Sequence, residues 1–147
     1  MKKFFICYNN IFTTASRVMQ PIFLFAIRAH VSWVFFKAGL NKIQSWETTL
    51  YLFEEEYKVP VIGPHIAAYL ATAGELVLPV ALTLGIVSRL SALGLFILNV
   101  VAVISYPLLW EMGFYDHQLW GLALFIVVLW GPGKLSLDYL LCKQLRK

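Results

Sequence analysis

Long apolar runs alternate with short polar stretches along this chain of 147 residues. A helix needs about 20 consecutive apolar residues to cross a bilayer. Four runs approach that length and are apolar all round, not along a single stripe. They cover residues 19–43, 65–87, 90–110 and 117–131. The pattern predicts an all-α membrane protein, with one domain over residues 1–147 built as an antiparallel bundle of four transmembrane helices.

Three shorter segments are amphipathic. Apolar residues recur at helical spacing on one face of residues 1–17, 45–58 and 135–146, and polar residues fill the other face. Helices of this kind lie along a membrane surface. We expect Ser45 to cap the second segment. We expect Gly131-Pro132-Gly133 to end the fourth span before the third segment begins.

The distribution of basic residues predicts the orientation of the bundle. Lys and Arg gather at one side of the spans, at Lys2, Lys3, Arg17, Arg89, Lys134, Lys143, Arg146 and Lys147. The other side carries Lys42 and Lys58 together with most of the acidic residues. Since basic loops stay in the cytoplasm, both termini are expected there. The formal charge of +4 is spread over helix ends, which argues against a nucleic-acid partner.

Two charged residues fall deep within the predicted spans, where charge is costly and often functional. With a rise of about 1.5 Å per residue, Arg28 lies roughly 13 Å and Glu75 roughly 18 Å from the same surface. An unpaired charge at such depth is unfavourable, so we expect Arg28 and Glu75 to form an ion pair inside the bundle. The pair either fixes the helix register or forms a substrate or proton site.

A second polar set lies toward the opposite membrane surface. Lys37 and Lys42 end the first span, Asn99 lies in the third, and Asp116 and His117 open the fourth. A histidine beside a carboxylate can carry protons near neutral pH, or it can simply sit at the interface. The three histidines show no ligand spacing and the two cysteines lie near opposite termini, so no metal site is expected.

The segment Gly131-Pro132-Gly133-Lys134-Leu135-Ser136-Leu137-Asp138 resembles the closing motif of the DoxX family. Arg28, Phe36, Gly39, Lys42, Glu75, Gly85 and Arg89 match other features of that family in order, over residues 20–140. The resemblance implies a bacterial four-helix bundle in the inner membrane, with structural roles for Gly131, Pro132, Gly133, Ser136 and Asp138. Some DoxX relatives take part in redox chemistry, including a subunit of a thiosulfate:quinone oxidoreductase.

Two functional hypotheses follow. One is a redox-associated membrane subunit that binds a quinone or a similar lipophilic cofactor beside Arg28 and Glu75. The other is a non-enzymatic small transporter, or an assembly partner for a peripheral or periplasmic enzyme. The sequence has no nucleophile–base set, nucleotide loop or haem attachment motif, which argues against a self-sufficient enzyme. The expected partners are the lipid bilayer and a protein of a redox or assembly complex.

Overall fold

The computed structural model describes the backbone of residues 1–145, and the side chains of all of these except residues 2–5 and 7. Every regular element in this part of the chain is helical, which confirms the all-α prediction. The helices are α1 (Lys2–Gln44), α2 (Trp46–Glu55), α3 (Pro64–Leu84), α4 (Ser88–Ser105), α5 (Phe114–Trp130) and α6 (Leu137–Leu145), with a 3-10 helix η1 (Pro107–Trp110).

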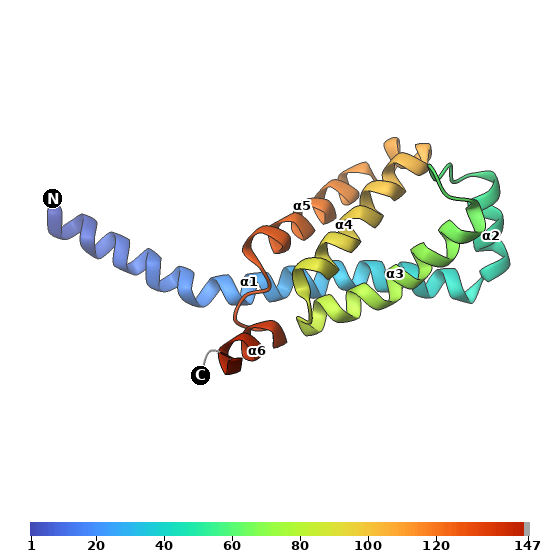
Figure 1. Cartoon of the computed structure of the whole chain (residues 1–147). Coiled ribbons are helices and arrows are strands. Elements are labelled where there is room, and N and C mark those ends of the chain that lie inside the picture. The colour runs from blue at the N-terminus through green and yellow to red at the C-terminus, as the bar shows by residue number, and fades with distance from the viewer. Residues whose placement is uncertain (146–147) are drawn as a thin grey trace.

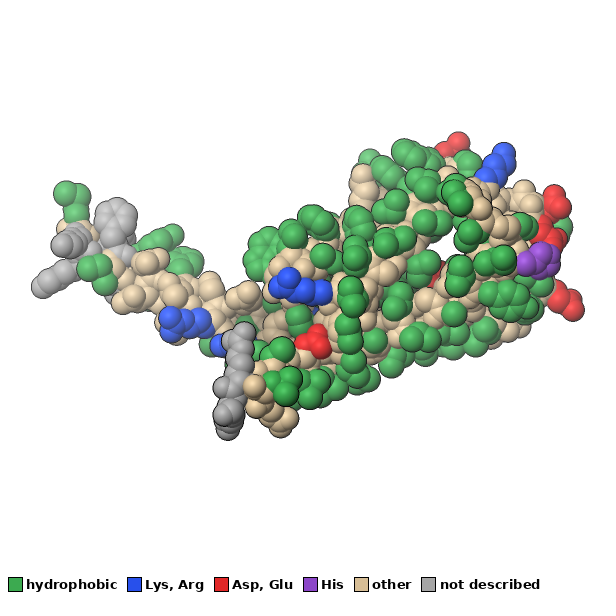
Figure 2. Space-filling view, in the orientation of Figure 1, with side chains coloured by type: hydrophobic (Ala, Val, Ile, Leu, Met, Phe, Trp, Pro, Cys, Tyr) green, Lys and Arg blue, Asp and Glu red, His purple; other side chains and the backbone are tan. Residues whose placement is uncertain are grey.

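Three helices are long and apolar enough to cross a membrane. They are α3, α4 and the part of α1 from Tyr8 to Gln44, and α5 is a shorter apolar helix of 17 residues. Hydrophobic side chains cover much of the outer surface of the bundle (Figure 2). An apolar outer surface of this extent fits contact with lipid. The chain is therefore a membrane protein.

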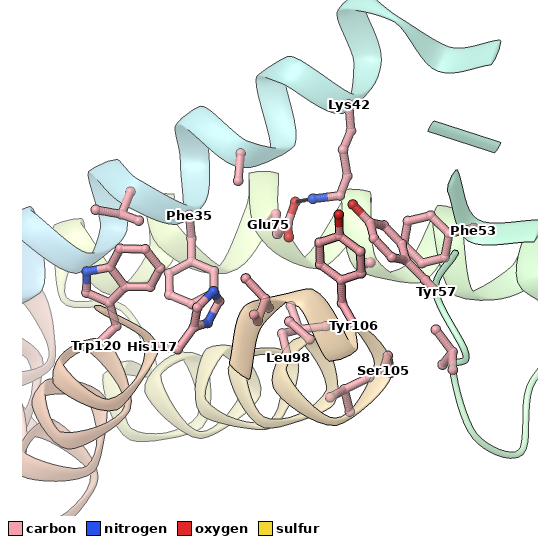
Figure 3. Close-up of a pocket in the computed structure, with 17 residues that line it drawn as sticks. Phe35, Lys42, Phe53, Tyr57, Glu75, Leu98, Ser105, Tyr106, His117 and Trp120 are labelled. Atoms are coloured by element: carbon pink, nitrogen blue, oxygen red, sulfur yellow. Dashed lines mark hydrogen bonds and ion pairs between the residues drawn. The ribbon is translucent and has the colours of Figure 1, made fainter. Parts of the chain in front are cut away.

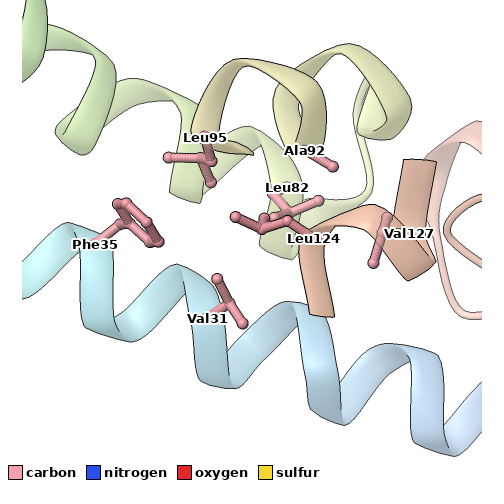
Figure 4. Packing of buried hydrophobic residues seen from close by; sticks show 7 residues of the cluster. All are labelled: Val31, Phe35, Leu82, Ala92, Leu95, Leu124 and Val127. Carbon is pink, nitrogen blue, oxygen red and sulfur yellow. The ribbon is translucent and has the colours of Figure 1, made fainter. Parts of the chain in front are cut away.

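The bundle contains α1, α3, α4 and α5, which pack against one another, whereas the first half of α1 extends beyond it (Figure 1). The core contains residues from α1, α3, α4 and α5 (Figure 4). Its buried members are Val31, Phe35, Leu82, Ala92, Leu95, Leu124 and Val127. Because these side chains interdigitate at the centre, the outward faces of the same helices are left for lipid.

Two predicted boundaries differ most from the structure, while the other ends of the spans shift by up to three residues. The separation between residues 1–17 and 19–43 is absent, since α1 runs unbroken and contains Pro21. A proline inside a helix lacks a backbone donor and usually kinks or ends the helix, yet α1 continues through Pro21. The third span ends at Ser105 instead of residue 110, because Tyr106 precedes a proline and adopts an extended conformation. Residues 107–110 then form η1.

The second and third surface segments form helices of their own, α2 and α6, which are shorter than predicted. Helix α2 starts directly after Ser45, although the Ser45 side chain makes no capping bond. Gly131 and Gly133 both have φ of +78° and separate α5 from α6, which confirms the predicted break. Arg146, at the end of the predicted 135–146 segment, lies outside the described residues.

Candidate functional site

Arg28 is fully buried, but it does not meet Glu75. Its guanidinium donates from Nη1 to the Leu82 carbonyl oxygen at 3.4 Å and from Nη2 to the Leu135 carbonyl oxygen. Glu75 instead accepts a hydrogen bond from Lys42 Nζ at 2.6 Å. The predicted Arg28–Glu75 ion pair is therefore wrong, and each residue belongs to a different site.

The packing of α1 against α3 explains the error. A Cβ atom built on Gly39 would lie 3.0 Å from the Leu76 side chain and 3.1 Å from Glu75 Cβ, so Gly39 is the residue opposite Glu75. Gly39 follows Arg28 by 11 positions, or roughly 16 Å along a helix. Arg28 instead faces the last turn of α3, so the bundle begins well after residue 19, where the first span was predicted to start.

The closing segment, residues 131–138, packs around Arg28. We use the name closing clamp for Arg28, Gly85, Ser88, Ser136 and Asp138. Asp138 accepts bonds from the Val87 amide at 2.8 Å, the Ser88 amide at 2.8 Å and the Ser88 hydroxyl at 2.7 Å. It thereby caps the start of α4, where Val87 has a positive φ of 46°.

Gly85 is required where the closing segment crosses the α3–α4 turn. It has a φ of +76°, and a Cβ atom there would lie 2.5 Å from Ser136 Cβ and 2.6 Å from Arg28 Nη1. The Gly85 carbonyl also accepts a 2.8 Å bond from the Asp138 amide. The clamp thus joins α1, α3, α4 and the start of α6, and its arrangement supports a structural role.

The stability that the clamp contributes depends on pH. Burial acts to raise the pKa of Asp138, but the bonds from Ser88 and Val87 and the charge of Arg28 outweigh it and hold the pKa below the ordinary 3.8. A depressed carboxyl pKa contributes stability above the unfolded value that is lost as the pH falls through the folded value. Asp138→Asn should lower the unfolding free energy by about 1 kcal/mol at neutral pH.

Chemical unfolding of both proteins across pH checks this prediction. The difference between wild type and Asp138→Asn should stay constant down to about pH 5 and shrink below the unfolded pKa of 3.8. The exposed Asp116, changed to Asn, is the control and should show no comparable difference. If the difference in unfolding free energy between wild type and Asp138→Asn is unchanged at low pH, the role assigned to the Asp138 carboxylate is contradicted.

Glu75 and Lys42 lie in a cavity of about 350 Å³ between α1, α3, α4 and α5. We call it the Lys42–Glu75 pocket (Figure 3). Its walls are mostly apolar and aromatic: Val34, Phe35, Ala38, Phe53, Tyr57, Val59, Ala71, Leu98, Val101, Ala102, Tyr106, Leu109 and Trp120, with Ser105 and His117. An apolar cavity with a few polar groups is typical of a site for a small lipophilic molecule.

One end of the pocket is polar. Lys42 and Glu75 are 20% and 13% exposed, and the Tyr57 and Tyr106 hydroxyls point toward the pair (Figure 3). The two tyrosine rings meet edge to face at 4.9 Å. The Lys58 amide donates to the Ser105 carbonyl at 2.9 Å, which holds the loop after α2 against the end of α4.

His117 is a further polar residue of the pocket. Asn99 Nδ2 donates to the His117 backbone carbonyl at 2.9 Å, and Asn99 Oδ1 lies 2.8 Å from His117 Nδ1. A carbonyl oxygen only accepts, so the amide orientation is fixed and Nδ1 must carry the proton. In the neutral ring, Nε2 then remains as the acceptor available to a ligand. The ring also packs edge to face on Trp120 at 4.8 Å.

The structure separates the other predicted site residues. Asn99 is buried and orients His117, whereas Lys37 and Asp116 are exposed and lie outside the pocket. Among the described residues, no group of three His, Cys, Asp or Glu side chains is placed to hold a metal ion. The chain runs from α5 to the closing clamp through Gly131, Pro132 and Gly133. In the clamp, the Ser136 hydroxyl donates to the Gly133 carbonyl and Asp138 accepts from the Ser88 amide.

The sequence interpretation missed the inward-facing aromatic residues. In the sequence, Tyr57, Tyr106 and Trp120 lie near one end of the predicted spans, where aromatic residues usually anchor a protein at the membrane surface. That position gave no indication that their rings face inward. The structure turns all three into the pocket. Ser105 was also missed: its buried hydroxyl has no hydrogen-bond partner in the described part of the chain, and an unpaired polar group beside a cavity is unusual.

Comparison with known proteins gives two matches. Residues 23–107 match the family model described as DoxX. An uncharacterised protein of Haemophilus influenzae is 32% identical over 129 residues, which cover 82% of this chain and 83% of that protein. No solved structure matches the chain significantly.

Proposed function

This chain belongs to the DoxX family, and we propose that it is a four-span inner-membrane protein that binds a lipophilic redox molecule, a quinone by preference, in the Lys42–Glu75 pocket. In this proposal the protein is the membrane subunit of an oxidoreductase complex. A partner supplies the electrons, and this chain holds the ligand and exchanges protons with it.

The helix lengths and the charge distribution support the proposed topology. Helix α5 has 17 residues and is about 26 Å long, close to the hydrocarbon thickness, so it is the fourth span. Arg89, Lys134 and Lys143 lie at the clamp end of the bundle, whereas Glu111 and Asp116 lie at the pocket end. By the distribution of basic residues, we place the clamp end and both termini in the cytoplasm.

The observation that carries the proposal is the arrangement of polar groups in an aromatic-walled cavity. Quinone oxygens accept hydrogen bonds, and Lys42 and the two tyrosine hydroxyls are donors. Quinol hydroxyls donate, and Glu75 and His117 Nε2 are acceptors. Reduction of a quinone takes up two electrons and two protons. Glu75 and His117 can relay these protons to the two ring oxygens, because each can first take up a proton from water, on a carboxylate oxygen and on Nε2 respectively, and then pass it to the quinone.

Removing the Lys42 ammonium tests the proposal. A hydrogen bond from a charged group is strong, so Lys42→Met should weaken the binding of a short-chain quinone by roughly tenfold or more. Binding is measured by quenching of tryptophan fluorescence in nanodiscs. Lys37→Met is the matched control, since Lys37 lies on the same helix but is exposed. Equal affinity in wild type and both variants, or no quinone binding at all, would refute the proposal.

One observation favours the non-enzymatic alternative. The first half of α1 extends past the bundle (Figure 1), and its apolar Ile11 and Phe12 are 62% and 56% exposed. A protruding helix of this kind suits an assembly partner of another membrane protein. That function predicts recovery of a partner with α1 intact, loss of the partner when residues 1–17 are deleted, and no quinone binding.

A further inference from the structure

A second hollow lies at the clamp end of the bundle, apart from the Lys42–Glu75 pocket. It is a groove of about 550 Å³ between α1, the start of α4, the end of α5 and the closing segment. Three cationic side chains line it, and each comes from a different part of the chain: Arg17 from α1, Arg89 from α4 and Lys134 from the closing segment. We call it the basic groove.

The charge of the basic groove is unbalanced. Arg17, Arg89 and Lys134 are exposed and make no ion pair with another described residue. The one carboxylate in the groove, Asp138, already accepts three hydrogen bonds from Val87 and Ser88. Three cations and one engaged anion leave a net charge of about +2, so the groove is suited to an anion.

The Arg89 side chain lies against the closing segment. A Cβ atom built on Gly131 would lie 3.4 Å from both Nε and Nη2 of Arg89, so the guanidinium lies against the glycine backbone. Gly131 itself has a φ of +78°, which a larger residue rarely adopts. One wall of the groove is thus built from the closing motif, and a planar guanidinium there can bind two oxygens of a phosphate at once.

The rim of the groove is apolar. Leu90 and Trp130 line it, and they are 65% and 62% exposed. Both lie at the ends of apolar helices, α4 at its start and α5 at its close, which places the groove at a membrane surface. Lipid phosphates lie at this depth, and basic pockets between membrane helices bind them. A free phosphate would contact the cations but, having no apolar part, would make no contact with the apolar rim.

We propose that the basic groove is a binding site for an anionic phospholipid, whose phosphate lies between Arg17, Arg89 and Lys134 and whose acyl chains lie over Leu90 and Trp130. The site is independent of the quinone proposal, because it shares no lining residue with the Lys42–Glu75 pocket. Since the lipid would contact α1, α4 and the closing segment together, its binding should stabilise the clamp end of the bundle.

Native mass spectrometry of the full-length protein tests the site. The protein is exchanged into mixed micelles with equal amounts of phosphatidylglycerol and phosphatidylcholine, and the lipid retained is counted. Wild type should retain phosphatidylglycerol preferentially. The double variant Arg89→Gln with Lys134→Gln should lower that affinity by roughly 30-fold, as expected for two cations at a lipid surface. The double variant Lys37→Gln with Lys58→Gln removes the same charge elsewhere and should keep the preference.

The outcomes separate the possibilities. Equal loss in both double variants would show that total charge alone attracts the lipid, and would overturn the site. Equal retention of both lipids by wild type would overturn it as well. Displacement of phosphatidylglycerol by millimolar inorganic phosphate would show a site for free phosphate, against the lipid assignment. Circular dichroism confirms that each variant is folded, since all four substituted side chains are exposed.

Discussion

Arg28→Ala should lower the free energy of unfolding by about 3–5 kcal/mol, the range for removing one partner from a buried charged network. Arg28 has no exposed surface, and it donates to the Leu82 and Leu135 carbonyl oxygens. The substitution leaves both carbonyls without this donor, removes the positive charge near Asp138 and opens a cavity. Reversible unfolding in mixed detergent, followed by circular dichroism, measures the loss.

Two further variants make the Arg28 result specific. Arg17→Ala removes the same side chain from an exposed position of the same helix and, in detergent free of anionic phospholipid, should change the free energy of unfolding by no more than about 0.5 kcal/mol. Arg28→Lys keeps the charge but loses the forked donor geometry, so it should recover only part of the stability. If Arg28→Ala matches Arg17→Ala, the clamp does not hold the helices together as argued here.

The elements were predictable from local sequence signals. Apolar runs located α3 and α4 because helices that face lipid have few other compositions available. Pro64 marks the start of α3 and Gly131-Pro132-Gly133 marks the end of α5, whereas α3 ends at Leu84, before the predicted residue 87. The start of the first bundle helix was not predictable, because α1 continues for many residues before it reaches α3 and no residue within it stops the helix.

The partner of Glu75 was missed for the same reason. The depth of a residue in the membrane can be calculated only if the residue at which the bundle begins is known. Because α1 is continuous, nothing in its sequence marks that residue. The small residue Gly39, which allows close approach to α3, was the better marker of register. Counting from Gly39 places Lys42, one turn further, beside Glu75, as the 2.6 Å contact shows.

The pocket itself depends on long-range contacts that no periodicity reveals. Tyr57 follows α2, and it reaches Tyr106 only because the loop after α2 folds back to the end of α4. An aromatic residue near a membrane surface has the same sequence signature whether its ring faces lipid or a cavity. His117 was recognised as a candidate, but the role of Asn99 in fixing its tautomer required the structure.

Filling the pocket with a phenyl ring should weaken ligand binding strongly without changing a charged residue. Ala71 lines the pocket, while Ala73, two positions later on α3, is exposed on the outer surface. Ala71→Phe places a ring where the ligand would lie. Overpacking of about 3 kcal/mol against a bound ligand corresponds to a loss of affinity of roughly 100-fold. The short-chain quinone titration described above measures it.

Ala73→Phe is the matched control, because it adds the same ring to the same helix but directs it to lipid, and it should bind the quinone as wild type does. Ala71→Phe should remain folded, since the ring enters a space of about 350 Å³. The pair of variants also separates the two functions. A membrane subunit that acts through a bound lipophile loses activity with Ala71→Phe alone, whereas an assembly partner that uses the exposed half of α1 keeps its partner in both. Unchanged quinone affinity in a folded Ala71→Phe protein would place the ligand outside this pocket, and the role given to Lys42 and Glu75 would fail with it.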